Sequence, residues 1–124
     1  MSDRLFLEDD GMDEDGCLMI YDNDYSFYKL VLETFRNEIP KTIKGMKDNY
    51  DSPNPEDYRI YVHGLKGSGG SAGARHLVEL ATQSNALIKE GRVDEAKQMH
   101  DSIIAELERL DRIIPERIRD FGGQ

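Results

Sequence analysis

Apolar residues recur at intervals of three and four along four stretches of the chain, and this spacing is the strongest constraint on its fold. The stretches cover residues 25–49, 54–72, 74–90 and 93–115. Side chains three and four apart share one face of an α-helix, so each stretch would form an amphipathic helix. Short links join the stretches, which favours successive helices that pack side by side in opposite directions. We therefore predict an all-α fold, an antiparallel four-helix bundle with a short N-terminal helix or arm.

Two prolines bear on where the predicted helices end. Pro40 lies inside the first stretch, where the apolar residues stay in register on both sides of it. A proline removes one backbone hydrogen bond and clashes with the preceding turn, so it kinks or divides a helix. We expect one kinked helix over 25–49 in preference to two segments that meet near Asn37. We expect the last helix to end or bend at Pro115.

The 124 residues fit one domain, and we assign residues 1–124 to a single helical domain. Residues 1–12 are acidic and contain glycine, so we expect a loosely ordered arm there, and we expect residues 122–124 to fray. Asp13 is a suitable cap for a short helix that follows the arm. The apolar residues that we expect to hold this helix against the bundle are Leu18, Met19 and Tyr21.

The balance of charge favours protein partners. The chain holds 16 Lys and Arg against 25 Asp and Glu, a net charge of −9. Binding to DNA or to an anionic membrane surface needs a basic face, so we expect neither nucleic-acid binding nor membrane binding. No apolar run approaches the roughly 20 residues that cross a bilayer, and the start of the chain lacks a signal-peptide core. We expect a cytoplasmic monomer in which Cys17 is a buried or half-buried small hydrophobic residue.

The stretch 59–74 combines a helical apolar spacing with a histidine on the opposite, polar face. The residues on that face include His63, Lys66, Gly67 and Gly70. Glycine inside a helix costs about 1 kcal/mol relative to alanine, so stability does not explain these glycines. Missing side chains would instead let another macromolecule approach His63. No Asp or Glu occurs between Asp57 and Glu79, and this gap favours an anionic group beside the histidine.

These residues resemble the signature of a known family. Histidine phosphotransfer (HPt) domains carry a His-x-Leu-Lys-Gly-Ser motif, which is similar to the run His63-Gly64-Leu65-Lys66-Gly67-Ser68. The flanking residues that extend the likeness over nearly the whole chain are Gly16-Cys17-Leu18, Asp24, Tyr28, Leu32, Phe35 and Gly73-Ala74. The resemblance implies a four-helix bundle that relays a phosphoryl group between the aspartates of receiver domains.

The resemblance also implies roles for single residues. His63 would be the phosphoacceptor, through its Nε2 atom, and Lys66 would stabilise the phosphoryl group. We expect Gly67 and Gly70 to contact the receiver, and Arg59 either to contact it as well or to supply a second cation for the phosphoryl group. The receiver would bring the phosphoaspartate and Mg²⁺, so we expect no cofactor or metal of this chain's own. The chain would then be a phosphoryl carrier rather than a free-standing catalyst.

A residue on the following helix often orients the histidine ring in related domains. If the chain reverses near Gly73, the residue facing His63 lies near Gln83, which is our first candidate. Asn85 is a weaker candidate. The family commonly has Leu-Glu where this chain has Ser84 and Asn85, so the orienting contact is the part of the site that the likeness fixes least.

Other interpretations stay open at this point. Receiver domains are the expected partners, and a hybrid sensor histidine kinase is a further candidate partner. The runner-up functions are the phosphoacceptor domain of a chemotaxis-type kinase and a module that docks receivers or kinases without accepting phosphate. A metal bundle lacks the paired Glu and Glu-x-x-His ligands that it needs. We interpret His76 and His100 as structural or solvated, and Ser68 and Ser71 as small residues under the docking surface.

Overall fold

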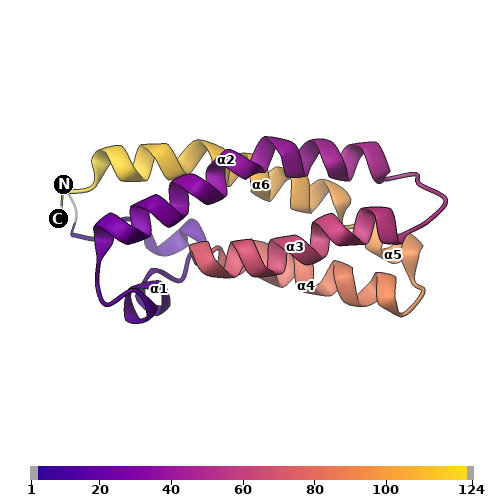
Figure 1. Ribbon diagram of the computed structural model, residues 1–124, viewed down its shortest axis with the longest axis horizontal. Coiled ribbons are helices and arrows are strands. Elements are labelled where there is room, and N and C mark those ends of the chain that lie inside the picture. Colours follow the sequence, from indigo (N-terminus) through magenta and orange to yellow (C-terminus); the bar gives the residue numbers. More distant parts are fainter. Residues whose placement is uncertain (1–2, 123–124) are drawn as a thin grey trace.

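The computed structural model describes residues 3–122 and consists of helices joined by short links. In chain order they are the 3-10 helix η1 (Glu8–Asp10), α1 (Glu14–Ile20), α2 (Tyr25–Asn49), α3 (Glu56–Ala72), α4 (Arg75–Lys89), α5 (Val93–Lys97) and α6 (His100–Asp120). The long helices form a ring in which α2 packs against α3 and α6, and α4 packs against the same two helices. Successive members of the ring run in opposite directions (Figure 1). The prediction of an all-α antiparallel four-helix bundle is confirmed.

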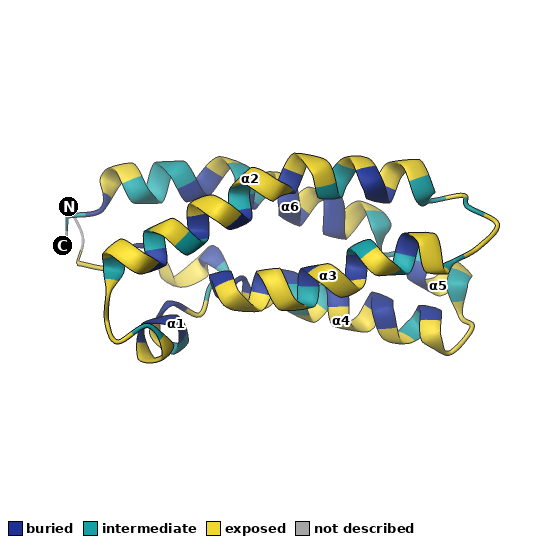
Figure 2. Ribbon diagram, in the orientation of Figure 1, coloured by how far each residue is buried: buried dark blue, intermediate teal, exposed yellow. Residues whose placement is uncertain are grey.

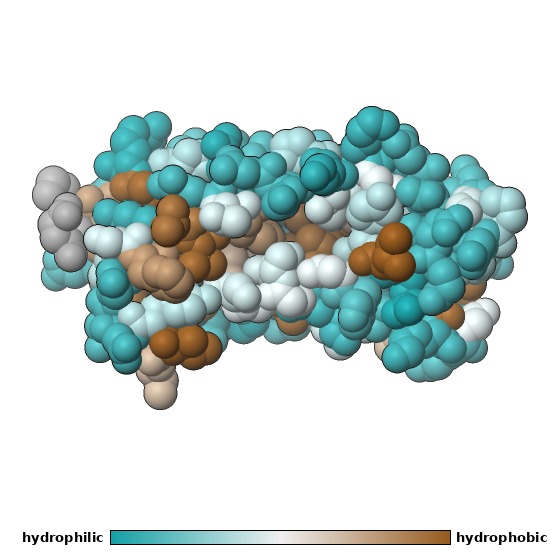
Figure 3. All heavy atoms as spheres, viewed as in Figure 1, coloured by the Kyte–Doolittle hydropathy of each residue, from teal (hydrophilic) through white to brown (hydrophobic). Residues whose placement is uncertain are grey.

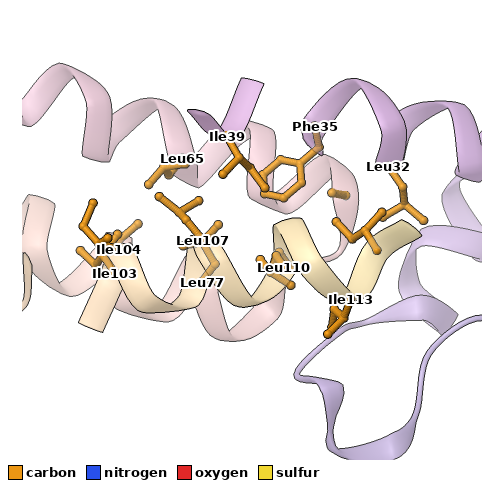
Figure 4. Close-up of a cluster of buried hydrophobic side chains, with 14 of the residues drawn as sticks. Leu32, Phe35, Ile39, Leu65, Leu77, Ile103, Ile104, Leu107, Leu110 and Ile113 are labelled. Atoms are coloured by element: carbon orange, nitrogen blue, oxygen red, sulfur yellow. The ribbon is translucent and has the colours of Figure 1, made fainter. Parts of the chain in front are cut away.

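The core lies along the axis of the bundle, where the apolar stripe of each long helix faces inward (Figure 2). Figure 4 shows a central part of this core, with α2 and α3 on one side and α4 and α6 on the other. The largest fully buried side chains are Tyr28, Leu32, Ile39, Met46, Val62, Leu77, Ile103, Leu107, Leu110 and Ile114. The stripes that predicted the bundle therefore also supply its core.

The helix boundaries follow local signals in the sequence. Asp24 caps α2, because its carboxylate accepts a hydrogen bond from the amide of Phe27 at 3.1 Å. The helix then continues through Pro40 to Asn49 as one element that changes direction part-way along its length (Figure 1). The preference for one kinked helix over two segments is confirmed. Gly73 ends α3 in the left-handed conformation at φ 76°, as a glycine after a helix does.

The last predicted helix is wrong in two respects. The chain turns at residues 98–99, which separates the short α5 from α6. α6 then continues past Pro115 to Asp120 instead of ending there. Proline has no N–H, so the carbonyl of Asp111 loses its partner within the helix. Arg36 of α2 replaces that partner: its Nε donates to the Asp111 carbonyl at 3.0 Å and lies 3.1 Å from the Asp111 carboxylate.

We expect Arg36→Ala to lower the free energy of unfolding by about 1–2 kcal/mol, because the Asp111 carbonyl would lose its donor. Urea denaturation measures the change. Arg112→Ala is a matched control, since Arg112 is exposed and its side chain makes no hydrogen bond or ion pair with any residue in the described range 3–122. In a Pro115→Ala background the helix recovers its own N–H, so the same Arg36 substitution should have a smaller effect. An equal loss in both backgrounds would contradict this account.

The expectation of a loosely ordered arm is wrong for residues 3–12. Leu5 and Phe6 are buried, at 3% and 6% exposure, and belong to the core. The carboxylate of Glu14 accepts hydrogen bonds from both of their amides at 2.9 Å. Asp10 pairs with Arg117 of α6 at 2.7 Å, and Arg117 holds the pKa of that carboxyl below its usual range despite burial. Acidic residues that suggested disorder are thus partners in the packing; residues 1–2 lie outside the described range.

The short helix α1 agrees with the sequence except at Met19. Asp13 caps it as predicted, accepting a hydrogen bond from the amide of Gly16 at 3.1 Å. Leu18 and Cys17 are buried, whereas Met19 points to solvent at 81% exposure and does not hold the helix in place. Of the predicted frayed tail, only Gly122 lies among the described residues, and it is half-buried.

Candidate functional site

The site lies on the outer face of α3, which lies in front of α4 in the view of Figure 1. The inner face of this helix buries Tyr58, Val62, Leu65, Gly69 and Ala72. A helical repeat of 3.6 residues turns His63 away from that face, and its side chain is exposed. Within the described range 3–122, the His63 ring makes no hydrogen bond and no ion pair. Both ring nitrogens are therefore available to an incoming group.

Three glycines leave the helix surface around His63 bare. A Cβ added at Gly64, Gly67 or Gly70 would meet no atom of a neighbouring element within 4 Å. Gly69 has a different role, since a Cβ there would lie 3.1 Å from the Val78 side chain of α4. Gly69 lets α3 and α4 approach closely, whereas the other three keep the outer surface clear.

Two cations lie one turn to either side of His63, and only one of them is free. Lys66 is half-buried and forms no ion pair with any residue that the structure describes. Arg59 is 21% exposed, and the Glu56 carboxylate holds its guanidinium by two hydrogen bonds at 2.6 and 2.8 Å. A third bond, at 3.1 Å, joins Arg59 to the amide oxygen of Asn85. The structure leaves Lys66 as the free cation of this face among the described residues.

Of the two candidates for orienting the His63 ring, Gln83 is exposed and Asn85 is buried. Gln83 is exposed and lines an open groove of about 450 Å³ between α3 and α4, together with Gly70 and Thr82. No hydrogen bond joins Gln83 to His63 in the described structure, so this role stays a prediction. Asn85 is buried and is engaged by Arg59. Ser84 is fully buried, and its hydroxyl has no partner among the described residues.

Exposed apolar side chains border the bare face on the side of α2. Phe27 and Leu30 of α2 are 46% and 59% exposed, and Ile60 of α3 is 59% exposed. Phe27 and Leu30 line a groove of about 380 Å³ whose opposite wall includes Ser68 and Ser71 of α3. Figure 3 shows hydrophobic side chains gathered at one end of this face, beside the paler surface of α3. Apolar residues exposed in this way are typical of surfaces that bind another protein.

The other two histidines have structural surroundings. His76 is exposed at the start of α4, 3.9 Å from Glu79. The Nδ1 atom of His100 is hydrogen-bonded to the Tyr58 hydroxyl at 2.8 Å, and its ring packs against Tyr50 at 4.5 Å. No group of three or more His, Cys, Asp or Glu side chains that could hold a metal occurs within residues 3–122.

We expect His100 to make the protein less stable in mild acid. Burial lowers its pKa, Lys47 acts in the same direction, and Asp101 opposes them. The folded-state pKa therefore lies below the unfolded value of about 6.5, so the unfolded chain binds the proton first as the pH falls. The free energy of unfolding should drop as the pH falls below about 6.5 and level off below the folded-state pKa.

The His100→Asn variant isolates this effect, because asparagine can still accept from Tyr58 but does not titrate. Urea denaturation at about pH 7.5 and about pH 5.5 should show a smaller loss of stability in the variant than in the parent protein. Equal losses in the two proteins would contradict the assignment.

The comparisons with known proteins identify the family. The family model for the Hpt domain matches residues 30–113, which include His63, Lys66 and all four helices of the ring in whole or part. The chain belongs to the Hpt domain family. Hpt domains are phosphotransfer domains of two-component systems and interact with receiver domains. No curated protein and no solved structure matched the chain. Among residues 3–122, none of the helices is both long and apolar enough to span a bilayer.

Sequence reasoning missed three features of this site. The Glu56–Arg59 pair had a local signal, because residues three apart are neighbours on a helix surface. The bond from Arg59 to Asn85 had none, since the two residues are 26 positions apart on different helices. Phe27 and Leu30 lie on the solvent side of α2, where the apolar stripe that predicted the helix gave no reason to look.

Proposed function

We propose that His63 of this Hpt domain accepts a phosphoryl group from the phosphoaspartate of one receiver domain and passes it to the aspartate of another. The observation that carries the proposal is an exposed imidazole, free of hydrogen bonds among the described residues, on a helix face that three glycines leave bare. A surface histidine without a function would not need its neighbouring positions to lack side chains. A histidine that must reach the aspartate of a second protein would need this open surface.

The chemistry asks little of this chain beyond position and charge. A neutral imidazole has a lone pair on one ring nitrogen, by the family likeness Nε2, which attacks phosphorus in line. The P–N bond forms as the P–O bond to the aspartate breaks, and the receiver's carboxylate leaves. Transfer to the second receiver reverses these steps. Lys66, one turn along, would neutralise charge on the equatorial oxygens in the transition state, and the receiver is expected to supply Mg²⁺.

The receiver would dock on the bare face and its apolar border. Gly67 and Gly70 allow close approach, and Phe27, Leu30 and Ile60 supply exposed apolar area. Arg59 is proposed as a contact at the other margin, where a receiver would have to share it with Glu56. With receivers as partners, we propose a cytoplasmic monomer that works beside receiver proteins and a hybrid sensor histidine kinase.

Phosphotransfer from a labelled receiver tests the proposal. The protein is mixed with a receiver domain from the same organism that carries radiolabelled phosphate on its aspartate. We expect label to move to this chain and to be labile in acid and stable in alkali, as a phosphohistidine is. Tight receiver binding without label would favour a docking module, and alkali-labile, acid-stable label would place the phosphate on a hydroxyl. Either result would overturn the proposal.

A further inference from the structure

The last turn of α3 is held by donors from a different part of the chain. The Tyr21 hydroxyl donates to the carbonyl of Ser71 at 2.7 Å, and the Tyr28 hydroxyl donates to the carbonyl of Ala72 at 2.8 Å. The backbone amide of Asp13 donates to the carbonyl of Gly73 at 2.7 Å. All of these donors lie between residues 13 and 28: Asp13 and Tyr21 are the two caps of α1, and Tyr28 lies in the first turn of α2.

Burial raises the pKa of both tyrosines, so each hydroxyl keeps its proton and remains a donor at neutral pH. The last carbonyls of any helix lack partners inside it and need donors from elsewhere. The segment 13–28 therefore acts as a cap for α3, supplied from 44 to 50 positions away in the case of the tyrosines.

This half of α3 needs external support more than an ordinary helix does. Gly67, Gly69 and Gly70 together cost on the order of 3 kcal/mol of helix stability relative to alanine. The hydroxyls of Ser68 and Ser71 each bond back to the carbonyl four residues earlier at 3.2 Å, an arrangement that weakens and bends helices. The half of the helix that follows His63 is thus intrinsically weak, and its end is fixed from outside.

The same half forms the bare face. At Gly67 and Gly70 a partner would contact the backbone itself, because no side chain covers it. The backbone conformation of this half of α3 therefore determines the shape of the surface. We propose that Tyr21 and Tyr28 are positioning residues for phosphotransfer, which hold the second half of α3 in the form that a receiver binds. The proposal rests on the proposed function, because it assigns these hydroxyls to receiver docking and not to the chemistry at His63.

Tyr21 links the cap to the apolar border of the face. Its ring lies edge-on to Phe27 with centroids 5.1 Å apart, and Phe27 lines the groove beside Ser68 and Ser71. A receiver that covers Phe27 would therefore bind next to Tyr21, whose hydroxyl caps α3. Tyr21 is only half-buried, so its hydroxyl can be removed without opening the core.

The test compares Tyr21→Phe with Tyr50→Phe. Both variants remove one hydroxyl and keep the ring, but the Tyr50 hydroxyl makes no hydrogen bond with any described residue, and the Tyr50 ring packs against Tyr58 in the first turn of α3, at the opposite end of that helix. Three quantities are measured: amide hydrogen exchange at residues 67–73, the receiver concentration that half-saturates phosphotransfer, and labelling of His63 by phosphoramidate, a small phosphodonor that needs no docking.

We expect Tyr21→Phe to speed exchange at residues 67–73 and to raise the half-saturating receiver concentration, each by about threefold to tenfold, the equivalent of one lost hydrogen bond. The maximal transfer rate and the phosphoramidate reaction should match those of Tyr50→Phe. Unchanged exchange and unchanged half-saturation would overturn the proposal. An equal fall in the phosphoramidate reaction would also overturn it, because the effect would then lie at His63. If the parent protein accepted no phosphoryl label from a receiver, that result would instead contradict the proposed function itself.

Discussion

No phosphoryl label is expected on the His63→Gln variant, whether the donor is a phosphorylated receiver or a small phosphodonor. Glutamine places an amide near the position of the ring nitrogen, but an amide nitrogen has no lone pair free to attack phosphorus. The His63 ring is exposed and has no hydrogen bond within the described range, so the substitution should change the free energy of unfolding by no more than about 0.5 kcal/mol. The expected result is complete loss of phosphorylation in a folded protein.

His76→Gln is the matched control. His76 is also exposed and lies near the α3–α4 link, so the change in charge and size is the same, and this variant should be labelled like the parent protein. Radiolabel and intact mass both report the outcome. Label that persists in His63→Gln, or that disappears from His76→Gln, would show that the phosphoacceptor is a different residue.

A side chain at Gly67 is expected to slow phosphotransfer from a receiver without making the protein less stable. A Cβ at Gly67 meets no atom within 4 Å, and replacing a helical glycine should stabilise the protein by about 1 kcal/mol. A longer side chain would stand between the helix and an incoming receiver and hold the phosphoaspartate away from His63. We expect Gly67→Gln to slow transfer from a receiver by about 100-fold, the loss of rate that a displacement of the reacting groups by about 1 Å can cause.

Two comparisons make the Gly67 result specific. Labelling by phosphoramidate should stay near the parent rate, because a small donor does not need the bare face. Ala105→Gln introduces the same side chain at an exposed position of α6 and should leave receiver transfer unchanged. A Gly67→Gln protein that is more stable and still accepts phosphate from receivers at the parent rate would contradict the docking surface proposed here.

The parts of the fold that the sequence predicted depend on neighbours within one or two turns. The apolar spacing fixed which face of each helix is buried, and the same spacing turned His63 outward. Asp13 and Gly73 mark helix ends through contacts with adjacent residues. These features repeat every few positions, so they can be recognised without knowledge of the tertiary structure.

The parts that the sequence did not predict depend on partners far along the chain. α6 continues through Pro115 because Arg36, 75 positions before Asp111, supplies a donor. The acidic arm is ordered because Glu14 accepts from Leu5 and Phe6 once all three are buried together. In a single sequence, acidic residues in such a segment indicate an exposed segment. Only the folded structure shows which carboxylates are buried and accept hydrogen bonds.

The site follows the same division. The sequence shows Lys66 three positions after His63, and residues three apart are neighbours on a helix surface, so their proximity could be predicted. The position of Arg59 did not, because Asn85 joins it from α4 across the helix pair. The tyrosine bonds to the end of α3 likewise connect segments that no local pattern relates.

Onward transfer is the measurement that tests the central claim most directly. The protein is labelled by one phosphorylated receiver, purified away from it, and mixed with a second, unlabelled receiver and Mg²⁺. If His63 is a relay carrier, label should leave this chain and appear on the second receiver's aspartate in equal amount, and no label should pass when His63→Gln is used. Label that stays on this chain or is released as free phosphate, without reaching any receiver, would contradict the account.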